Sequence, residues 1–156
     1  MTCLYSTVSG RPIRWQIRPK ESEDVDELRR LYMEARLGTF ARLGLNTSAF
    51  TLTDFDVVTE GEEIWVAVSD GKLIGFVSCW LPDQFIHSLY VDPGFLRQGV
   101  GKALLRECLS KLGRPAFLKC LQQNTNAIAF YKQQGWQIKS EGISHEGLYF
   151  LMTIDD

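Results

Sequence analysis

The chain has 156 residues, 45% of them hydrophobic and 12% aromatic, which suffices for one hydrophobic core and predicts one domain. Its formal net charge of −2 gives no sign of the dense positive charge that is typical of proteins that bind nucleic acid or an anionic membrane. We therefore expect a small molecule or a basic partner, no nucleic acid, no membrane, and a monomer or homodimer.

The four cysteines lie far apart, and no two of them have the Cys-x-x-Cys spacing of a metal site or redox motif. Cys79, Cys108 and Cys120 fall in apolar runs, whereas Cys3 lies near the start. We expect reduced thiols, no metal and a cytoplasmic location. The first 18 residues lack the apolar segment of a signal peptide, and no apolar run reaches the length of a membrane span.

The first predicted element is a strand preceded by a tail. Residues 1–12 are rich in Ser, Thr and Gly without periodicity, and we predict a loose tail there, followed by a single domain over residues 13–156. Residues 13–18 alternate apolar and polar side chains, as a half-buried strand does. Ser22 can then cap a helix whose apolar stripe runs to Ala35.

The middle of the chain contains an irregular segment and a hairpin. Residues 38–60 show little periodicity, apart from a short helix that Thr51 could cap. The β-rich runs over residues 64–68 and 73–80 are joined through Asp70-Gly71, which is a strong hairpin signal.

The second half of the chain alternates strands and helices. Predicted strands cover residues 85–91, 116–121, 136–139 and 148–154, and predicted helices cover residues 101–112 and 124–134. The order of all elements is strand, two helices, three strands, helix, strand, helix and two strands. It predicts an α/β fold with a central mixed sheet of about seven strands and helices on its faces.

A glycine-rich loop, Arg97-Gln98-Gly99-Val100-Gly101-Lys102, lies between a predicted strand and a predicted helix. Its glycines allow a ligand to approach the backbone, and the unpaired amides of the first helical turn favour phosphate, to which Arg97 and Lys102 add positive charge. A nucleoside triphosphate loop needs Ser or Thr where Ala103 stands, and a dinucleotide fingerprint needs glycine where Leu104 stands. Both of these alternatives are disfavoured.

Three motifs follow one another in a characteristic order. They are Leu89-Tyr90-Val91 at a strand end, the loop from Leu96 to Gly101, and the segment from Asn124 to Trp136, which contains Ala127 and Phe130-Tyr131. In this order they resemble the GNAT superfamily of acetyltransferases, over roughly residues 64–136. Leu96 departs from the family's Arg or Gln, so that Arg97 would supply that contact with phosphate, and Trp136 replaces the usual Phe.

The resemblance implies a mixed but mostly antiparallel sheet whose middle strands splay apart, with helices on both faces. It also implies an enzyme that moves an acetyl group from acetyl-CoA to a primary amine by direct attack in a ternary complex. The residues that it assigns to the cofactor are Leu89, Tyr90 and Val91 for the pantetheine arm, Arg97, Gln98, Gly99, Val100, Gly101 and Lys102 for the pyrophosphate, and Asn124, Ala127 and Tyr131 near the acyl end.

Two side chains are candidates for proton transfer. Tyr131 keeps its proton at neutral pH because the ordinary pKa of a phenol is about 10, and it could protonate the departing thiolate as general acid. His87, with an ordinary pKa of about 6.5, could act as general base, and it resembles the histidine of a His-x-Leu-x-Val segment that lies near the amine in some family members. The alternatives are a tyrosine packed on the sheet, a histidine satisfied by backbone, and Asp83 as a carboxylate that orients or replaces His87.

The acceptor pocket is predicted to involve residues 38–60, Tyr32, Trp80 and the loop over residues 142–147, because such folds vary their specificity in loops. Cys79 shows no sign of activation, so that no covalent acyl-enzyme is expected. Two other functions fit the same motifs: a non-catalytic module that binds or senses acyl-CoA, and a transferase of a longer acyl group.

Overall fold

The computed structural model describes residues 2–8, 11–48 and 50–155, with side chains from residue 15 onward. The described strands are β1 (Thr2–Val8), β2 (Arg11–Pro19), β3 (Glu63–Ser69), β4 (Lys72–Trp80), β5 (Phe85–Val91), β6 (Ala116–Leu121), β7 (Gln137–Ser144) and β8 (Gly147–Ile154). The α-helices are α1 (Val25–Arg42), α2 (Asp54–Val58), α3 (Val100–Leu112) and α4 (Thr125–Gln133).

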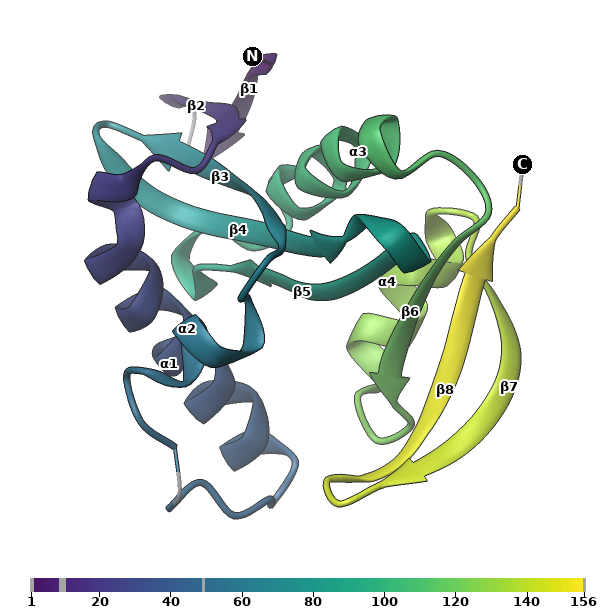
Figure 1. The fold of residues 1–156 in the computed structure, drawn as a ribbon. Helices are drawn as coiled ribbons and strands as arrows, with labels where there is room; N and C mark the ends of the chain where they lie inside the picture. The colour runs from purple at the N-terminus through teal and green to yellow at the C-terminus, as the bar shows by residue number, and fades with distance from the viewer. Residues whose placement is uncertain (1, 9–10, 49, 156) are drawn as a thin grey trace.

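The eight described strands form one sheet in the order β1-β2-β3-β4-β5-β6-β8-β7 (Figure 1). Neighbouring strands in the described residues are antiparallel, except for β5 and β6, which are parallel. The mixed, mostly antiparallel sheet is therefore confirmed. The seven strands from β2 to β8 correspond to the seven predicted ones, and β1 is additional.

The N-terminal end differs from the predicted tail. Residues 2–8 form β1, which pairs with β2 from Thr2 opposite Ile17 to Val8 opposite Arg11. Hydrophobic periodicity could not predict β1, because strand pairing uses main-chain hydrogen bonds that any sequence of non-proline residues can make.

Helix α1 begins differently from its prediction and runs further. Ser22 starts a 3-10 turn, and the side chain that stabilises this turn is that of Asp24, which accepts a hydrogen bond from the Glu21 backbone N–H at 2.7 Å. The helix continues past Ala35 because Phe40, which is only 8% exposed, extends its apolar stripe.

Helices cover both faces of the sheet, and each face has its own core (Figure 1). On one face, α3 and α4 pack against residues such as Trp65 and Val77. On the other face, α1 and α2 pack against residues such as Val66 and Phe76. Successive side chains of β3 and β4 thus point to opposite cores, as expected for strands buried on both faces.

The sheet divides between β5 and β6. These strands share only two residue pairs, Phe85 opposite Phe117 and Ile86 opposite Leu118. β5 then continues alongside β4, while β6 continues alongside β8, and Figure 1 shows the two halves diverging. The predicted splay is confirmed. Within the described chain, it leaves residues 87–91 of β5 without a neighbouring strand on one side.

Candidate active site

The start of α3, at one end of the splay, has the geometry of an anion site. Arg97 and Gly99 both adopt the left-handed conformation, with φ angles of 62° and 84°, and they turn the chain into the helix at Val100. Ala103 N–H donates to the Gly99 carbonyl at 3.0 Å. The amides before Ala103 have no carbonyl one turn earlier within the helix, so they point out of the helix end, where phosphate is favoured.

The α3 start lies against both β5 and α4. A Cβ atom at Gly101 would lie 3.5 Å from Phe130 Cζ and 3.6 Å from Val91 Cγ2. Gly101 therefore keeps the helix end close to the strand edge. The structure thus brings together the three motifs on which the family resemblance depends.

Close to the start of α3, the side chains of β5 point alternately into the two cores. Leu89 and Val91 pack against the core on the α3 side. The Tyr90 ring points to the other face and packs 5.6 Å from the ring of Tyr32. Over this stretch, the backbone N–H and C=O groups of β5 therefore face the gap left by the splay. Such groups are what hydrogen bonding to a pantetheine arm requires.

Asn124 caps α4. Its Oδ1 accepts hydrogen bonds from Ala127 N–H and from Arg42 Nη2, both at 3.4 Å. The contact between Asn124 and Ala127 forms the first turn of α4, and Phe130-Tyr131 follow one turn later. Direct contact of Asn124 or Ala127 with a cofactor remains a prediction.

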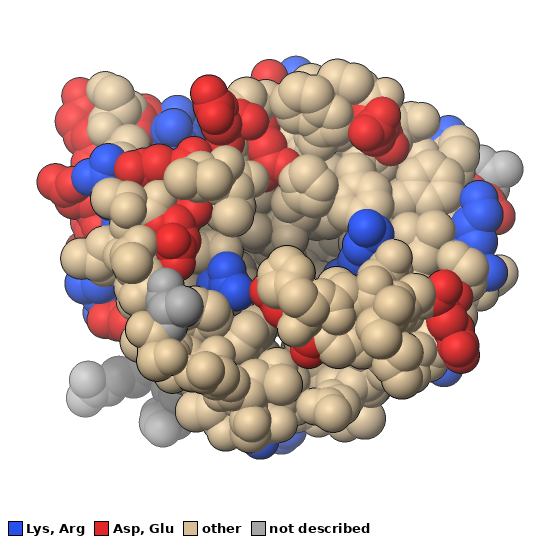
Figure 2. Space-filling model, turned by 60° about the horizontal axis from the view of Figure 1, so that its bottom comes forward, with Lys and Arg blue, Asp and Glu red and all other residues tan. Residues whose placement is uncertain are grey.

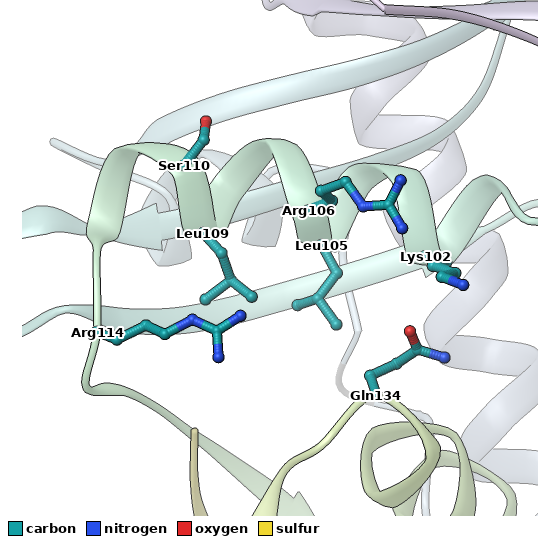
Figure 3. A pocket seen from close by; sticks show the side chains of 7 residues that line it. All are labelled: Lys102, Leu105, Arg106, Leu109, Ser110, Arg114 and Gln134. Carbon is teal, nitrogen blue, oxygen red and sulfur yellow. The ribbon is translucent and has the colours of Figure 1, made fainter. Parts of the chain in front are cut away.

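A basic groove extends along the outer side of α3 (Figure 3). It has a volume of about 420 Å³ and is lined by Lys102, Leu105, Arg106, Leu109, Ser110, Arg114 and Gln134. Lys102 and Arg106 lie one helical turn apart, and Arg114 reaches in from the segment after α3. Because Lys102 also belongs to the α3 start, the groove continues the anion site with further positive charge.

Tyr131 lies beside the two strands that diverge. Its ring packs 5.3 Å from Phe130 and 5.9 Å from Trp136. Burial raises the pKa of Tyr131 above its ordinary value, and interactions with Cys120 on β6 and Tyr90 on β5 act in the same direction. Tyr131 therefore keeps its proton at neutral pH. It is also packed on the sheet, which was the alternative role proposed from the sequence.

His87 lies where β5 leaves β6. Ser78 pairs with Ser88 and Cys79 pairs with Ile86, so His87 is an extra residue at a β-bulge. The bulge interrupts the two-residue alternation of side chains along β5. It allows the His87 side chain, which is 44% exposed, to leave the sheet surface.

The carboxylate beside His87 is that of Glu62, which the sequence did not single out. Glu62 Oε2 is within hydrogen-bond distance of His87 Nδ1, and only 2% of the Glu62 side chain is exposed. Asp83, the expected partner, lies in an exposed 3-10 turn instead. The one sequence feature that could have indicated Glu62 is an acidic residue just before a buried strand. Glu63 has the same feature, so the sequence could not distinguish the two.

A second group of residues joins α1 to the turn between β7 and β8. Arg36 donates hydrogen bonds to Tyr32 Oη at 2.6 Å and to Glu146 Oε1 at 3.2 Å. Its guanidinium also lies 4.2 Å from the centre of the Phe50 ring. Tyr32 and the loop over residues 142–147 are thus brought together, as predicted for the acceptor pocket.

Trp80 lies apart from this group. A Cβ atom at Gly61 would lie 3.0 Å from Trp80 Cζ3, so the Trp80 ring covers Gly61 at the far end of β4. The structure therefore gives Trp80 a packing role next to the turn that carries Glu62.

The face of the molecule shown in Figure 2 is hollowed near its centre, and acidic residues gather on the side formed by α1 and α2. Residues 21–63 contain eleven acidic and four basic residues. This part of the chain is therefore strongly negative, although the whole chain has a net charge of only −2.

Two further features concern the described residues alone. They contain no cluster of three or more His, Cys, Asp or Glu side chains that could hold a metal ion. None of the helices seen there has both the length and the apolar character needed to cross a membrane.

Comparison with known proteins identifies the family. Residues 25–136 match the Acetyltransferase (GNAT) family, which is well over half of the chain. The chain belongs to the GNAT acetyltransferase family. The GNAT match includes α1, the divergent strands, the α3 start and α4.

Curated GNAT relatives align over shorter segments. Peptidyl-lysine N-acetyltransferase YiaC of Escherichia coli is 36% identical over 83 residues, which are 53% of this chain and 56% of YiaC. Peptidyl-lysine N-acetyltransferase YjaB of Salmonella typhimurium is 34% identical over 76 residues, which are 48% of this chain and 50% of YjaB. The chain thus spans about half the length of the curated relatives that it matches.

A solved structure shows the same GNAT fold over nearly the whole chain. The PaiA N-acetyltransferase from Thermoplasma acidophilum, whose crystal structure is a complex with coenzyme A, aligns with a TM-score of 0.76 at 20% identity. The alignment covers 91% of this chain and 99% of PaiA. At this identity, the likeness establishes the fold.

Proposed function

We propose that this protein transfers the acetyl group of acetyl-CoA to the primary amine of a lysine side chain on a protein, by direct attack in a ternary complex. The observation that carries the proposal is the splay of β5 from β6 next to the start of α3. A free strand edge and a helix end suit an extended ligand that has amides along its length and phosphates at one end. The coenzyme A bound to PaiA supports this choice of ligand.

The residues present fit the parts of coenzyme A. The amides at the start of α3, from Gly99 to Lys102, would hold the pyrophosphate, and the backbone of Leu89 to Val91 would pair with the pantetheine arm. The edge from His87 to Val91 is about 13 Å long, at about 3.3 Å per residue. This length separates the anion site beside Val91 from His87, whereas Tyr131 lies nearer to the start of α3, next to Phe130. The basic groove with Arg106 would hold the 3′-phosphate.

The negative charge near the proposed acceptor site supports an acceptor lysine that is flanked by basic residues. The negative region over residues 21–63 borders the hollow seen in Figure 2 and would attract a positively charged segment of a partner protein. The names of YiaC and YjaB as peptidyl-lysine N-acetyltransferases support the same class of acceptor.

The reaction requires two proton transfers, one to His87 and one from Tyr131. The ammonium of lysine, with an ordinary pKa of about 10.4, must lose a proton before its nitrogen can attack, and His87 would accept it. Acetyl-CoA supplies the thioester whose C–S bond breaks as the C–N bond forms. Tyr131 would give its proton to the departing sulfur and regain one from solvent, while His87 returns its proton to solvent.

An acceptor screen with detection of free thiol tests the proposal. Peptides with one lysine between basic flanks should release coenzyme A from acetyl-CoA faster than peptides with acidic flanks, and acetylation of the lysine should be visible by mass spectrometry. Peptides whose lysines are already acetylated are the matched control. Thermal stabilisation by acetyl-CoA without thiol release from any amine would favour a binding module instead.

A further inference from the structure

We infer that Glu62 is a positioning residue for the base His87: its carboxylate holds the imidazole in the tautomer with the proton on Nδ1, which leaves Nε2 free to take the proton of the acceptor amine. The inference rests on the proposed acetyl transfer and adds a residue to it. It starts from one contact, between Glu62 Oε2 and His87 Nδ1.

The sheet brings the two side chains together from opposite sides of β4. Glu63 on β3 and Ile86 on β5 both pair with Cys79 of β4. Because β3 and β5 run in the same direction, Glu62 lies one residue before the level of Cys79 and His87 lies just after it, so the two residues are near neighbours on either side of β4. The bulge at His87 then permits its side chain to reach across β4 to Glu62.

A tight turn fixes the Glu62 backbone before β3 begins. Glu62 N–H donates to the Thr59 carbonyl at 2.9 Å, and Thr59 Oγ1 donates to the Phe55 carbonyl at 2.7 Å. Gly61 takes a φ of 76°, and the Trp80 ring covers it. The backbone of Glu62 is therefore held by contacts of the turn that do not involve His87.

The surroundings of Glu62 differ from those of a structural ion pair. Asp24 uses both of its carboxylate oxygens on Arg18, at 2.7 and 3.0 Å. Glu62, which is more deeply buried, uses only Oε2, while Oε1 is buried without a hydrogen-bond partner among the described residues. Such an oxygen destabilises the fold, so this carboxylate is not arranged for stability in the way that Asp24 is.

The exposed fractions of the two side chains fit the two roles. The Glu62 side chain is 2% exposed and the His87 side chain 44% exposed, so that one edge of the ring meets a shielded carboxylate while the rest can meet an acceptor. With Nδ1–H donated to Glu62, the lone pair of Nε2 is available for the amine proton. The negative carboxylate then stabilises the imidazolium that forms.

Few other titratable groups face His87. Lys119 of β6 lies with its Nζ 6.0 Å from the centre of the Phe85 ring, and that ring packs 4.8 Å from the His87 ring. On the other side, the hydrogen bond that Cys108 shares with Cys79, together with burial, raises the pKa of Cys108, which keeps this thiol protonated. Glu62 is therefore the anion in direct contact with His87.

Kinetics of four variants across the pH range test the inference. Glu62→Gln should lower kcat at least about 10-fold, with the KM for acetyl-CoA changed less than about twofold, because a glutamine amide no longer fixes the tautomer. His87→Gln should lower kcat by about 10²-fold or more. The double variant should be no slower than His87→Gln alone, since Glu62 acts through His87. Glu141→Gln, the same change at an exposed residue of β7 outside the negative region, should match the wild type.

A spectroscopic measurement keeps the test independent of turnover. In the wild-type protein at high pH, the ¹⁵N shifts of the His87 ring should show the neutral tautomer with the proton on Nδ1. In Glu62→Gln, the ring should shift toward the tautomer with the proton on Nε2. Glu141→Gln should leave the spectrum unchanged.

Three results would overturn the inference: a wild-type ring with its proton on Nε2, a Glu62→Gln kcat equal to that of the wild type, or losses that multiply in the double variant. None of these results would affect the proposed acetyl transfer, which depends on thiol release by the wild type. If the wild type binds acetyl-CoA but acetylates no amine, the proposed function fails, while the tautomer still reports the contact with Glu62.

Discussion

At the scale of single residues, Tyr131 shows how packing prepares a group for proton transfer. Its ring is fixed by Phe130 and Trp136, and burial raises the pKa of its hydroxyl. A group with these properties remains protonated across the neutral pH range. It can therefore serve as an acid for a thiolate without titrating itself.

Replacing Tyr131 with Phe removes this proton and preserves the ring. We expect kcat to fall by about 10²-fold or more, while the dissociation constant of acetyl-CoA changes less than about threefold, because the contacts of the ring with Phe130 and Trp136 remain. Steady-state kinetics and calorimetric titration measure the two quantities. A variant with unchanged kcat would remove Tyr131 from the mechanism.

Asp24 shows the opposite pKa shift and carries a prediction about stability. Hydrogen bonds from Arg18 are the main cause that lowers the pKa of Asp24. A carboxyl group whose pKa is lowered by folding stabilises the fold above its unfolded pKa of about 3.9, and this contribution is lost as the pH falls through the lower, folded pKa.

We expect Asp24→Asn to reduce the free energy of unfolding by about 1–3 kcal/mol at pH 7, because Asn offers Arg18 no charge. The difference from the wild type should shrink as the pH falls below about 4, where the wild-type carboxyl also becomes neutral. Urea unfolding at several pH values measures both effects. Asp26→Asn is the matched control, since the Asp26 side chain is 95% exposed, and a constant difference at all pH values would contradict the assignment.

Glu62 marks the limit of sequence analysis at this scale. Tyr131 and His87 could be proposed because each lies in a recognisable segment. Glu62 is 25 residues from His87, and their contact depends on the register of three strands and on a bulge, neither of which a local pattern encodes. Asp83 is nearer to His87 in sequence, but the carboxylate that contacts His87 in the structure is that of Glu62.

At the scale of elements, α3 combines two anion-binding features on one helix. Its first turn presents unpaired amides, and its outer side carries Lys102 and Arg106 along the basic groove. The first feature depends on backbone conformation and the second on side-chain charge. Substitutions on the outer side can therefore separate them.

We expect Arg106→Gln to weaken binding of acetyl-CoA about fivefold or more at low ionic strength, because one charge-assisted contact is lost. Binding of 3′-dephospho-acetyl-CoA should be nearly unaffected, and added salt should reduce the difference. Lys111→Gln, an equal change on the same helix outside the groove, is the control. Equal weakening for both ligands would place the 3′-phosphate elsewhere.

The elements themselves could be read from the sequence with few exceptions. The β-rich runs and the Asp70-Gly71 turn predicted the β3–β4 hairpin, and the glycines at 99 and 101 predicted the start of α3. β1 was missed because its pairing leaves no periodic trace in its side chains. The end of α1 was missed because the stripe continues through Phe40 after a segment that lacked periodicity.

At the scale of the whole molecule, two of the connections between the diverging halves lie on either side of the splay. One is the pairing of β5 with β6 over two residue pairs. The other is the ion pair of Arg36 with Glu146, which links α1 to the β7–β8 turn across 110 residues of sequence. No local pattern could predict the second connection.

We expect Glu146→Gln to raise the KM for a lysine peptide severalfold, because the change loosens the part of the molecule proposed to bind the acceptor. The KM for acetyl-CoA should change less than about twofold, since Glu146 lies away from the start of α3. Glu141→Gln, an exposed residue on β7, is the control. A larger effect on acetyl-CoA than on the peptide would contradict this division of the surface.

The free edge of β5 has a further consequence, because it lies inside the sheet and not at its rim. Exposed strand edges at a rim invite pairing with other chains and lead to aggregation. The β5 edge is instead flanked by the β6–β8 half of the same sheet, so another chain would have to enter between the two halves to pair with it. The protein can thus keep unsatisfied hydrogen-bonding groups ready for its ligand without becoming a template for its own self-association.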